Sequence, residues 1–218
     1  MSERLSLTCH GHAAFSIETK AGVLLIDPHE PDLFGGLMDY PKITAAVDAV
    51  VCTHDHLDHC AVEGLVGEAQ LLDSSVSAWR GGAIERYKAD HDEYGGRRRG
   101  GQVDVLRLRY EDWSIVHLSD VGQSPDPGWM EALYRPDLCI VPVGGFYTMG
   151  AAQAWSWCMR MAPRCIVPMH FGTPYCKLPL LSPDVFLSYV RGDVSYMGAH
   201  WHSICRESLP FCAMMTVE

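Results

Sequence analysis

The stretch 50–59, VVCTHDHLDH, joins an apolar strand to a turn crowded with metal-binding side chains. Residues 48–52 have the short apolar composition of a buried strand, which would deliver the turn at its carboxyl end. Neutral imidazoles suit zinc, iron or manganese, and a carboxylate adds charge and a hard oxygen. Within six residues the turn offers four candidate ligands: His54, His56, Asp58 and His59.

A structural alternative for this turn is a polar loop whose histidines are only solvated or hydrogen-bonded. That interpretation suits a lone histidine better than four donors gathered at the end of one strand.

The number of donors also indicates how many ions the site holds. A single open metal site needs fewer than four ligands from one loop. The excess of donors predicts two adjacent metal ions.

Two ions need further ligands from distant parts of the chain, and the best candidates follow other apolar strands. Asp120 and His170 each stand after such a strand. An aspartate can offer one oxygen to both ions, so Asp120 is the predicted bridge. The third histidine of the first ion is His91 or His117. Because side chains alternate along a strand, His117 and Asp120 would face opposite sides, and we therefore predict His91.

Length and charge restrict the class of protein. The 218 residues predict one domain over 1–218, with a core at about 5–173 and a C-terminal elaboration at about 174–218. A formal charge of −10 argues against binding to nucleic acid, which needs a basic surface. The N-terminus lacks a signal pattern and no apolar run approaches about 20 residues, so we expect a cytoplasmic protein that does not enter a membrane.

The nine cysteines lie mostly in apolar stretches, their number is odd, and none are spaced as Cys-x-x-Cys. This pattern is typical of small core residues in a reducing compartment rather than of a disulfide framework or a zinc ribbon. Cys60, directly after His59, is also expected to be a structural residue.

The order of the predicted elements indicates a mixed α/β, layered fold. Strands with hairpin turns come early, and strands alternating with helices come late. Helices are predicted around 75–80, at 129–134 and at 150–161. No repeat or interdomain linker interrupts this order.

These motifs, in this order, resemble the metallo-β-lactamase superfamily, most of all its small metal-dependent hydrolases of the ascorbate-6-phosphate lactonase-like branch. The resemblance covers about residues 11–173 and implies a single-domain αββα sandwich with the metals at one edge of two sheets. It rests on these motifs: Gly11-His12-Ala13, Ile26-Asp27-Pro28, Thr53 to His59, His91-Asp92, Asp120-Val121-Gly122, Pro142 to Gly145 and Pro168 to Thr173.

Carried over position by position, the resemblance implies a ligand set for each ion. The first ion would be bound by His54, His56 and His91, the second by Asp58, His59 and His170, and both by Asp120. The chain departs from the family at Ser119, where glycine is usual, and in its tail with His200 and His202, which we expect to shape the substrate pocket.

The predicted function is a dinuclear metal-dependent hydrolase. Two divalent ions, zinc before manganese or iron, would lower the pKa of a bridging water so that its hydroxide attacks the substrate. The substrate would be a small molecule with an ester, lactone, amide or phosphodiester bond. Asp58 would orient the nucleophile or pass on its proton. His12 is either a proton donor beside it or a histidine hydrogen-bonded near a strand end.

Residues around the ligands suggest how a substrate would bind. Arg99, in the run 97–99, would favour an anionic group, and Tyr147 would line the pocket, although a charge run is often a solvated loop. Asp27 is predicted to stabilise the turn before Pro28, with a hydrogen bond to the backbone of the loop 53–59 as one way, rather than to contact the substrate. Two other functions stay open: a dinuclear iron redox protein, and a biosynthetic enzyme that closes a ring or eliminates a group. The oligomeric state is also open, with a homo-oligomer as one option.

Overall fold

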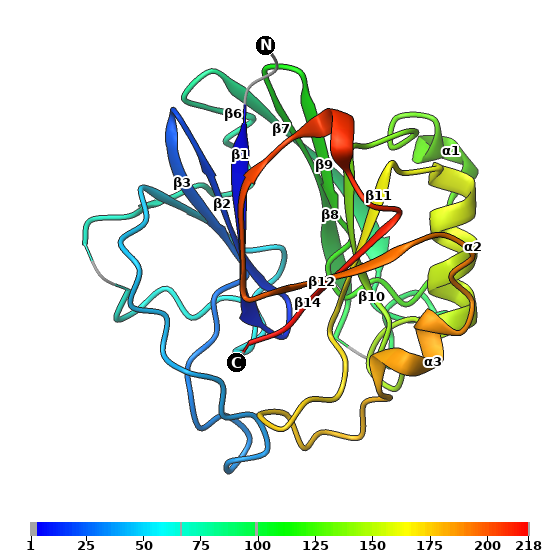
Figure 1. The fold of residues 1–218 in the computed structure, drawn as a ribbon. Coiled ribbons are helices and arrows are strands. Elements are labelled where there is room, and N and C mark those ends of the chain that lie inside the picture. Colours follow the sequence, from blue (N-terminus) through cyan, green and yellow to red (C-terminus); the bar gives the residue numbers. More distant parts are fainter. Residues whose placement is uncertain (1–3, 66, 99, 218) are drawn as a thin grey trace.

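The computed structural model describes residues 4–65, 67–98 and 100–217, which form two β-sheets packed face to face (Figure 1). The first sheet contains β1 (Leu5–Gly11), β2 (Ala14–Thr19), β3 (Gly22–Ile26), β4 (Ala49–Val51), β5 (Gln70–Leu71) and β13 (His200–Ile204). Its order is β13-β1-β2-β3-β4-β5, with β3 parallel to β4.

The second sheet has eight strands and carries most of the later sequence. They are β6 (Ala78–Trp79), β7 (Gly82–Asp90), β8 (Gln102–Tyr110), β9 (Trp113–His117), β10 (Leu138–Pro142), β11 (Cys165–Met169), β12 (Val194–Gly198) and β14 (Cys212–Met215). Their order is β12-β14-β11-β10-β9-β8-β7-β6. β9, β10 and β11 are parallel neighbours, whereas β7, β8 and β9 form antiparallel pairs.

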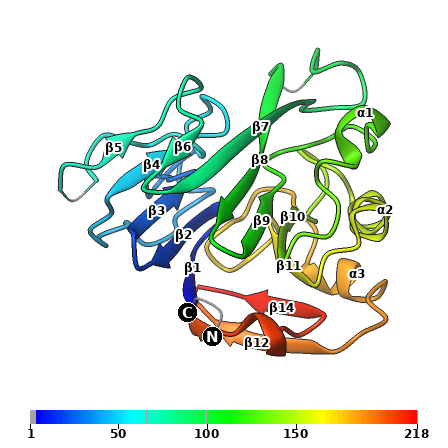
Figure 2. The ribbon, with the colours of Figure 1, turned by 90° about the horizontal axis from the view of Figure 1, so that it is seen from above.

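Helices cover only the outer face of the eight-stranded sheet in the described part of the chain, as Figure 2 shows from above. They are α1 (Pro127–Met130), α2 (Ala151–Met161) and α3 (Pro183–Leu187), and a short 3-10 turn η1 (Arg206–Ser208) precedes β14. α2 buries Ala154, Trp157 and Met161 against this sheet. No helix among these is long and apolar enough to cross a membrane.

The layered α/β fold predicted from the sequence is confirmed, with one difference from a full αββα sandwich. The outer face of the six-stranded sheet is covered by loops, whose Ile43 and Val47 pack on Leu25 and Val50. The loop between β4 and β5 turns at Gly64, whose φ is 88°. This left-handed conformation does not fit within an α-helix. Apolar loop residues therefore take the place of a helix on this side.

The helix predicted around 75–80 is wrong, because this segment forms a β-hairpin. β6 pairs antiparallel with β7 through a two-residue turn at Arg80 and Gly81. Both residues have positive φ, at 44° and 85°. Two successive left-handed residues are the requirement of a tight hairpin turn that follows the twist of the strands.

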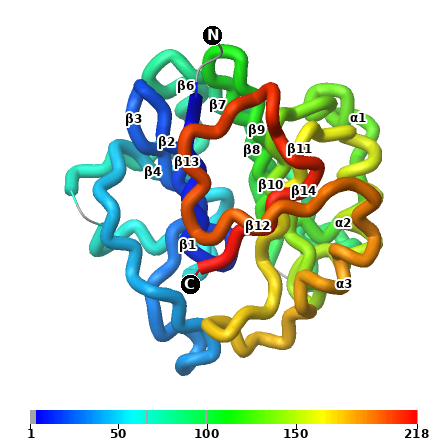
Figure 3. Tube along the Cα trace, viewed as in Figure 1, coloured from blue at the N-terminus to red at the C-terminus, as the bar shows by residue number. Residues whose placement is uncertain are grey.

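The C-terminal residues 174–217 add strands to both sheets. Figure 3 shows this last part of the chain, in orange and red, crossing along one side of the sandwich from one sheet to the other. β13 pairs with β1 of the first sheet, and β14 pairs with β11 of the second. His200 and His202 stack on each other with 5.7 Å between ring centroids, and both are exposed.

Candidate metal centre

The candidate ligands lie where strands of both sheets end, at one rim of the sandwich. β4 leads into the loop 53–59, which we call the metal loop. β7, β9 and β11 run in one direction and lead into His91, Asp120 and His170. Because equally directed strands end at the same edge of a sheet, three separate segments bring their donors to one place.

Asp120 lies at the centre of this group. Its Oδ2 atom is 3.2 Å from Nε2 of His59, 3.4 Å from Nε2 of His170 and 3.5 Å from Nε2 of His91. The carboxylate is buried, with only 2% of its residue surface exposed. One carboxylate therefore faces imidazoles from three different segments of the chain.

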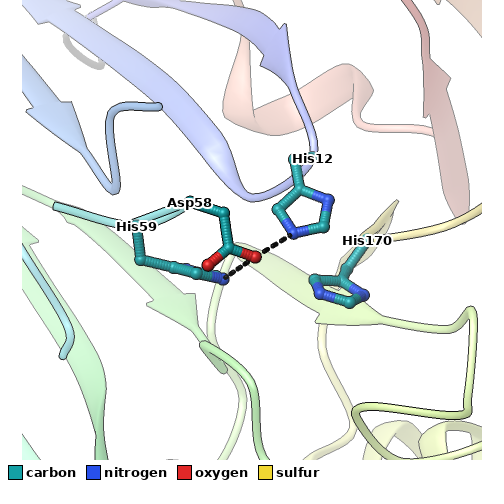
Figure 4. Close-up of side chains that lie close together, drawn as sticks. All are labelled: His12, Asp58, His59 and His170. Atoms are coloured by element: carbon teal, nitrogen blue, oxygen red, sulfur yellow. Dashed lines mark hydrogen bonds and ion pairs between the residues drawn. The ribbon is translucent and has the colours of Figure 1, made fainter. Parts of the chain in front are cut away.

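The other candidate ligands among the described residues form three overlapping groups, and within each group the ligand atoms lie within 4.8 Å of one another. The first group contains His54, His56 and His91, and the second contains His12, Asp58, His59 and His170. The third, Asp27 with His54 and His59, connects the first two. Figure 4 shows the second group, with the side chains pointing toward one another. The structure thus brings together the seven ligands inferred from the sequence, and it adds His12 to the second set.

Several buried polar atoms of these side chains have no hydrogen-bond partner among the described residues. Those that face the centre of the group are Nε2 of His59 and Oδ1 of Asp120. A buried polar group without a partner is costly, so it requires an explanation. Nitrogen and carboxylate lone pairs converging on one place are the donor set of a zinc, iron or manganese site, and the residues present therefore fit such ions.

Asp27 holds the metal loop from behind. It is fully buried and accepts hydrogen bonds from the backbone N–H and from the hydroxyl of Thr53, each at 2.7 Å. His59 donates from Nδ1 to Asp27 at 2.9 Å. With the proton fixed on Nδ1, the lone pair of Nε2 faces Asp120. This carboxylate–histidine pair is the usual support of a metal-binding imidazole.

Thr53 fixes the second imidazole of the loop in the same way. Its hydroxyl gives its only proton to Asp27 and accepts a hydrogen bond from the hydroxyl of Ser119 at 2.7 Å. Nδ1 of His54 lies 3.0 Å from the same oxygen and must therefore be the donor. This leaves the lone pair of His54 on Nε2, which faces the other ligands.

Ser119 occupies the position where the resemblance leads one to expect glycine. Its φ is 52°, so it adopts the left-handed conformation that glycine reaches without a side-chain clash. Its N–H donates to Nδ1 of His117, whose Nε2 donates to the carbonyl of Ala13. His117 is thus a buried link between the sheets, and Asp120 keeps its place in the site.

The electrostatics of the cluster favour a cation. Burial lowers the pKa of His54 to about 3, so its ring is neutral at pH 7. Burial would raise the pKa of Asp120, but His170 and His59 hold it well below its usual value. Burial opposes protonation of His59, yet Asp120 and Asp27 raise its pKa. A proton and a metal ion compete for the same Nε2 atom, and both respond to this negative charge.

The cluster opens into a cavity of about 780 Å³. Tyr147, predicted from the sequence as a substrate contact, lines this cavity, and so does Arg98. Arg99, the arginine chosen from the sequence, lies outside the described residues. The cavity size is that of a pocket for a small organic molecule.

Cys60 has a structural role, as expected, but the expectation that the cysteines are unpaired core residues is wrong for it. It forms a disulfide with Cys52, with 5.2 Å between the Cα atoms. The bond connects the end of β4 to the residue after His59 and so closes the whole metal loop. The other seven cysteines are free. No sequence pattern predicts this pair, because the seven residues between the cysteines match no disulfide or metal spacing.

Removing this disulfide is expected to destabilise the protein. The bond closes a loop over a sequence separation of 8, for which loop entropy gives about 2–3 kcal/mol. A Cys52→Ser/Cys60→Ser variant should lose that free energy of unfolding relative to the oxidised protein, as measured by urea titration. Reductant should lower the stability of the wild type to the level of the variant. Equal stability of variant and oxidised wild type would contradict the prediction; Cys205→Ser, a half-exposed free thiol, is the control.

A two-sheet sandwich with histidines and an aspartate at its strand ends defines a metallo-β-lactamase fold. Residues 6–170 match the family described as the beta-lactamase superfamily domain, which is most of the chain. The protein therefore belongs to the β-lactamase superfamily. A metal-dependent hydrolase of Rhizobium etli is 28% identical, and the match covers 89% of this chain and 96% of that protein.

Solved structures agree with this assignment. A Thermotoga maritima protein, assigned to the Zn-dependent hydrolases of the metallo-β-lactamase superfamily, superposes with a TM-score of 0.80 at 25% identity; the match covers 98% of this chain and all of that one. The diiron β-hydroxylase CmlA of Streptomyces venezuelae shares the fold at 12% identity, with a TM-score of 0.61, over all of this chain and 53% of its own.

Proposed function

We propose that this protein is a hydrolase that uses two divalent metal ions to cleave a small ester, lactone, amide or phosphodiester. The observation that carries the proposal is Asp120, whose carboxylate stands between two groups of donors from both sheets. One ion would be held by His54, His56 and His91 and the other by Asp58, His59 and His170. The relatives named metal-dependent hydrolases support the same reaction class.

Bound divalent ions would supply a Lewis acid and a hydroxide at neutral pH. The protein itself fixes the donors through the hydrogen bonds of Asp27 and Thr53, so little reorganisation is needed on binding. Asp58 faces the cavity, where it can orient a water molecule or take up its proton. His12 lies with Nε2 3.1 Å from Oδ2 of Asp58 and holds that carboxylate in position.

The backbone around these residues supports a site that is fixed in advance. His12, Asp27, Ser119 and His170 all have φ between 49° and 54°, although none is glycine. Such left-handed residues are costly and cluster at functional sites, where the surrounding structure holds them. The ring of His12 lies 4.0 Å from that of His170, so both left-handed turns meet at the second metal group.

Metal analysis and turnover together test the proposal. The purified protein should contain two ions per chain, with zinc as the expected metal, and should hydrolyse members of a panel of lactones, aryl esters and phosphodiesters. A chelator should abolish the activity and zinc should restore it. Two irons with oxygen consumption and no hydrolysis would contradict the proposal and favour the redox chemistry found on this fold.

Chelation is also expected to lower the thermal stability. An ion present at about 100 times its Kd stabilises the folded state by about 2.7 kcal/mol, which corresponds to a decrease in Tm of about 5–10 °C on removal. Differential scanning fluorimetry with and without EDTA measures this change, and added zinc should reverse it. If the Tm of the metal-loaded protein did not respond to EDTA, the ligand cluster would not hold ions in the native state.

A further inference from the structure

We propose that the substrate carries an apolar group and an anionic group, the first bound by a rim of aromatic and aliphatic side chains and the second by Arg98. This inference rests on the proposed function, because it describes the cavity above the metal ligands. The rim consists of Phe34, Leu57 and Phe146, which line that cavity. Each comes from a different loop of the fold.

The rim residues are large, apolar and exposed beside the candidate catalytic centre. The exposed fraction is 45% for Phe34, 69% for Leu57 and 56% for Phe146. Leu57 stands inside the metal loop, between the ligands His56 and Asp58. Apolar side chains gathered at the mouth of a pocket mark a surface that is covered when a ligand binds. The exposed leucine is thus held beside the candidate metal ligands by its two neighbours in the chain.

Both aromatic rim residues have a backbone conformation that phenylalanine rarely adopts. The φ angle is 54° at Phe34 and 58° at Phe146, in the left-handed region. Neither residue belongs to the buried hydrophobic core, since 45% of Phe34 and 56% of Phe146 is exposed. Costly conformations that place two aromatic rings at one cavity point to a role in ligand binding. Phe146 also packs edge-on against Tyr147, with ring centroids 4.7 Å apart.

Arg98 supplies positive charge on the opposite loop of the cavity. Its guanidinium stacks over the ring of Tyr94 at 3.6 Å, and its backbone N–H donates to Asp92 at 2.7 Å. Asp92 also accepts from the N–H groups of Tyr94 and Gly96, and it directly follows the ligand His91. Stacking uses the face of the guanidinium and leaves its in-plane N–H groups for a carboxylate or phosphate. The loop therefore holds a cation at a fixed place beside the metal ligands.

Two fluorescent probes that differ by one charged group test both parts of the proposal. 1-Anilinonaphthalene-8-sulfonate carries an apolar body and an anion, and N-phenyl-1-naphthylamine is its uncharged counterpart. Titration into the zinc-loaded protein should show tighter binding of the sulfonate. Phe146→Ala or Phe34→Ala should weaken both probes about tenfold. Arg98→Gln should weaken only the sulfonate, by about three- to fivefold, and remove the preference between the probes.

Tyr196→Ala is the matched control, because this aromatic residue is 75% exposed and lies on β12 away from the cavity. It should bind both probes like the wild type. Equal binding by wild type, Phe34→Ala and Phe146→Ala would overturn the apolar part. A sulfonate preference retained in Arg98→Gln would overturn the role of Arg98. Because binding is measured without turnover, these results stand whether or not the protein is a hydrolase.

A series of p-nitrophenyl esters connects the inference to catalysis. From acetate to hexanoate, kcat/KM of the zinc-loaded protein should rise about fourfold per methylene, and Phe146→Ala should flatten this rise. Hydrolysis without dependence on chain length, together with unchanged probe binding in the variants, would overturn the inference and leave the proposed function intact. If the probes bound as expected but no ester, lactone, amide or phosphodiester were hydrolysed, the proposed function would be wrong, and the inference about the binding surface would stand.

Discussion

Replacing Asp120 by alanine is expected to remove both metal binding and turnover. Loss of a residue that only supports a metal ligand costs 10–100-fold in affinity or activity as a rough guide, so loss of the shared carboxylate should exceed about a hundredfold in kcat/KM. The reason is that Oδ2 faces His59, His91 and His170 within 3.5 Å, and among the described residues no other carboxylate forms an ion pair with all three. Elemental analysis and the EDTA dependence of the Tm measure the loss of ions directly.

Asp112→Ala is the control for this variant. Asp112 is exposed in the turn before β9, whereas Asp120 follows the other end of the same strand. The control should keep its metal content and activity. Asp120→Asn, which preserves shape and removes charge, distinguishes electrostatics from folding: it should fold, yet bind metal poorly. A fully active Asp120→Ala protein without metal would show that the proposed chemistry is wrong.

Replacing Asp27 by asparagine is expected to produce the second-largest effect. Asp27 accepts three hydrogen bonds, two from Thr53 and one from Nδ1 of His59. The amide removes the negative charge and offers only one acceptor oxygen. Zinc affinity should therefore fall about 10–100-fold, and the free energy of unfolding should fall by about 1–3 kcal/mol. Competition with a chromophoric chelator measures the affinity, and urea titration measures the stability.

Asp48→Asn is the matched control for Asp27. Asp48 also accepts a hydrogen bond from a backbone N–H of the first sheet, that of Val23 at 2.9 Å, but it is partly exposed and pairs with Arg80. Its replacement should leave zinc affinity unchanged. Equal zinc affinity for Asp27→Asn and Asp48→Asn would show that the buried carboxylate does not support His59.

The sequence predicted much of the site because ligand chemistry and strand ends are local properties. The motif at 53–59 follows an apolar strand, and Asp120 and His170 follow others. The strands involved run in the same direction, so their ends meet at one rim. No knowledge of longer-range contacts is needed to predict this. The helix expected around 75–80 failed for a local reason as well. Arg80 and Gly81 both adopt left-handed conformations, which form a hairpin turn and prevent the helix that the periodicity predicts.

Other features depended on contacts that no local pattern encodes. Cys52 and Cys60 pair because the metal loop folds back on itself. His12 and Asp58, 46 residues apart, meet because β1 and β4 belong to one sheet. Strand alternation favours His91 over His117 as a ligand, and in the structure the His117 ring donates a hydrogen bond to the carbonyl of Ala13.

The sequence alone determined which residues can bind metal, because short segments such as 53–59 contain the donor atoms, their spacing and the apolar strand before them. The tertiary structure alone decided the distances between those donors, with Asp120 within 3.5 Å of three imidazoles, and which apolar side chains surround them. The distances depend on how segments far apart in the sequence meet, and the apolar rim includes left-handed residues such as Phe34 and Phe146. Such conformations are held by the whole fold, because they are unfavourable for the isolated chain.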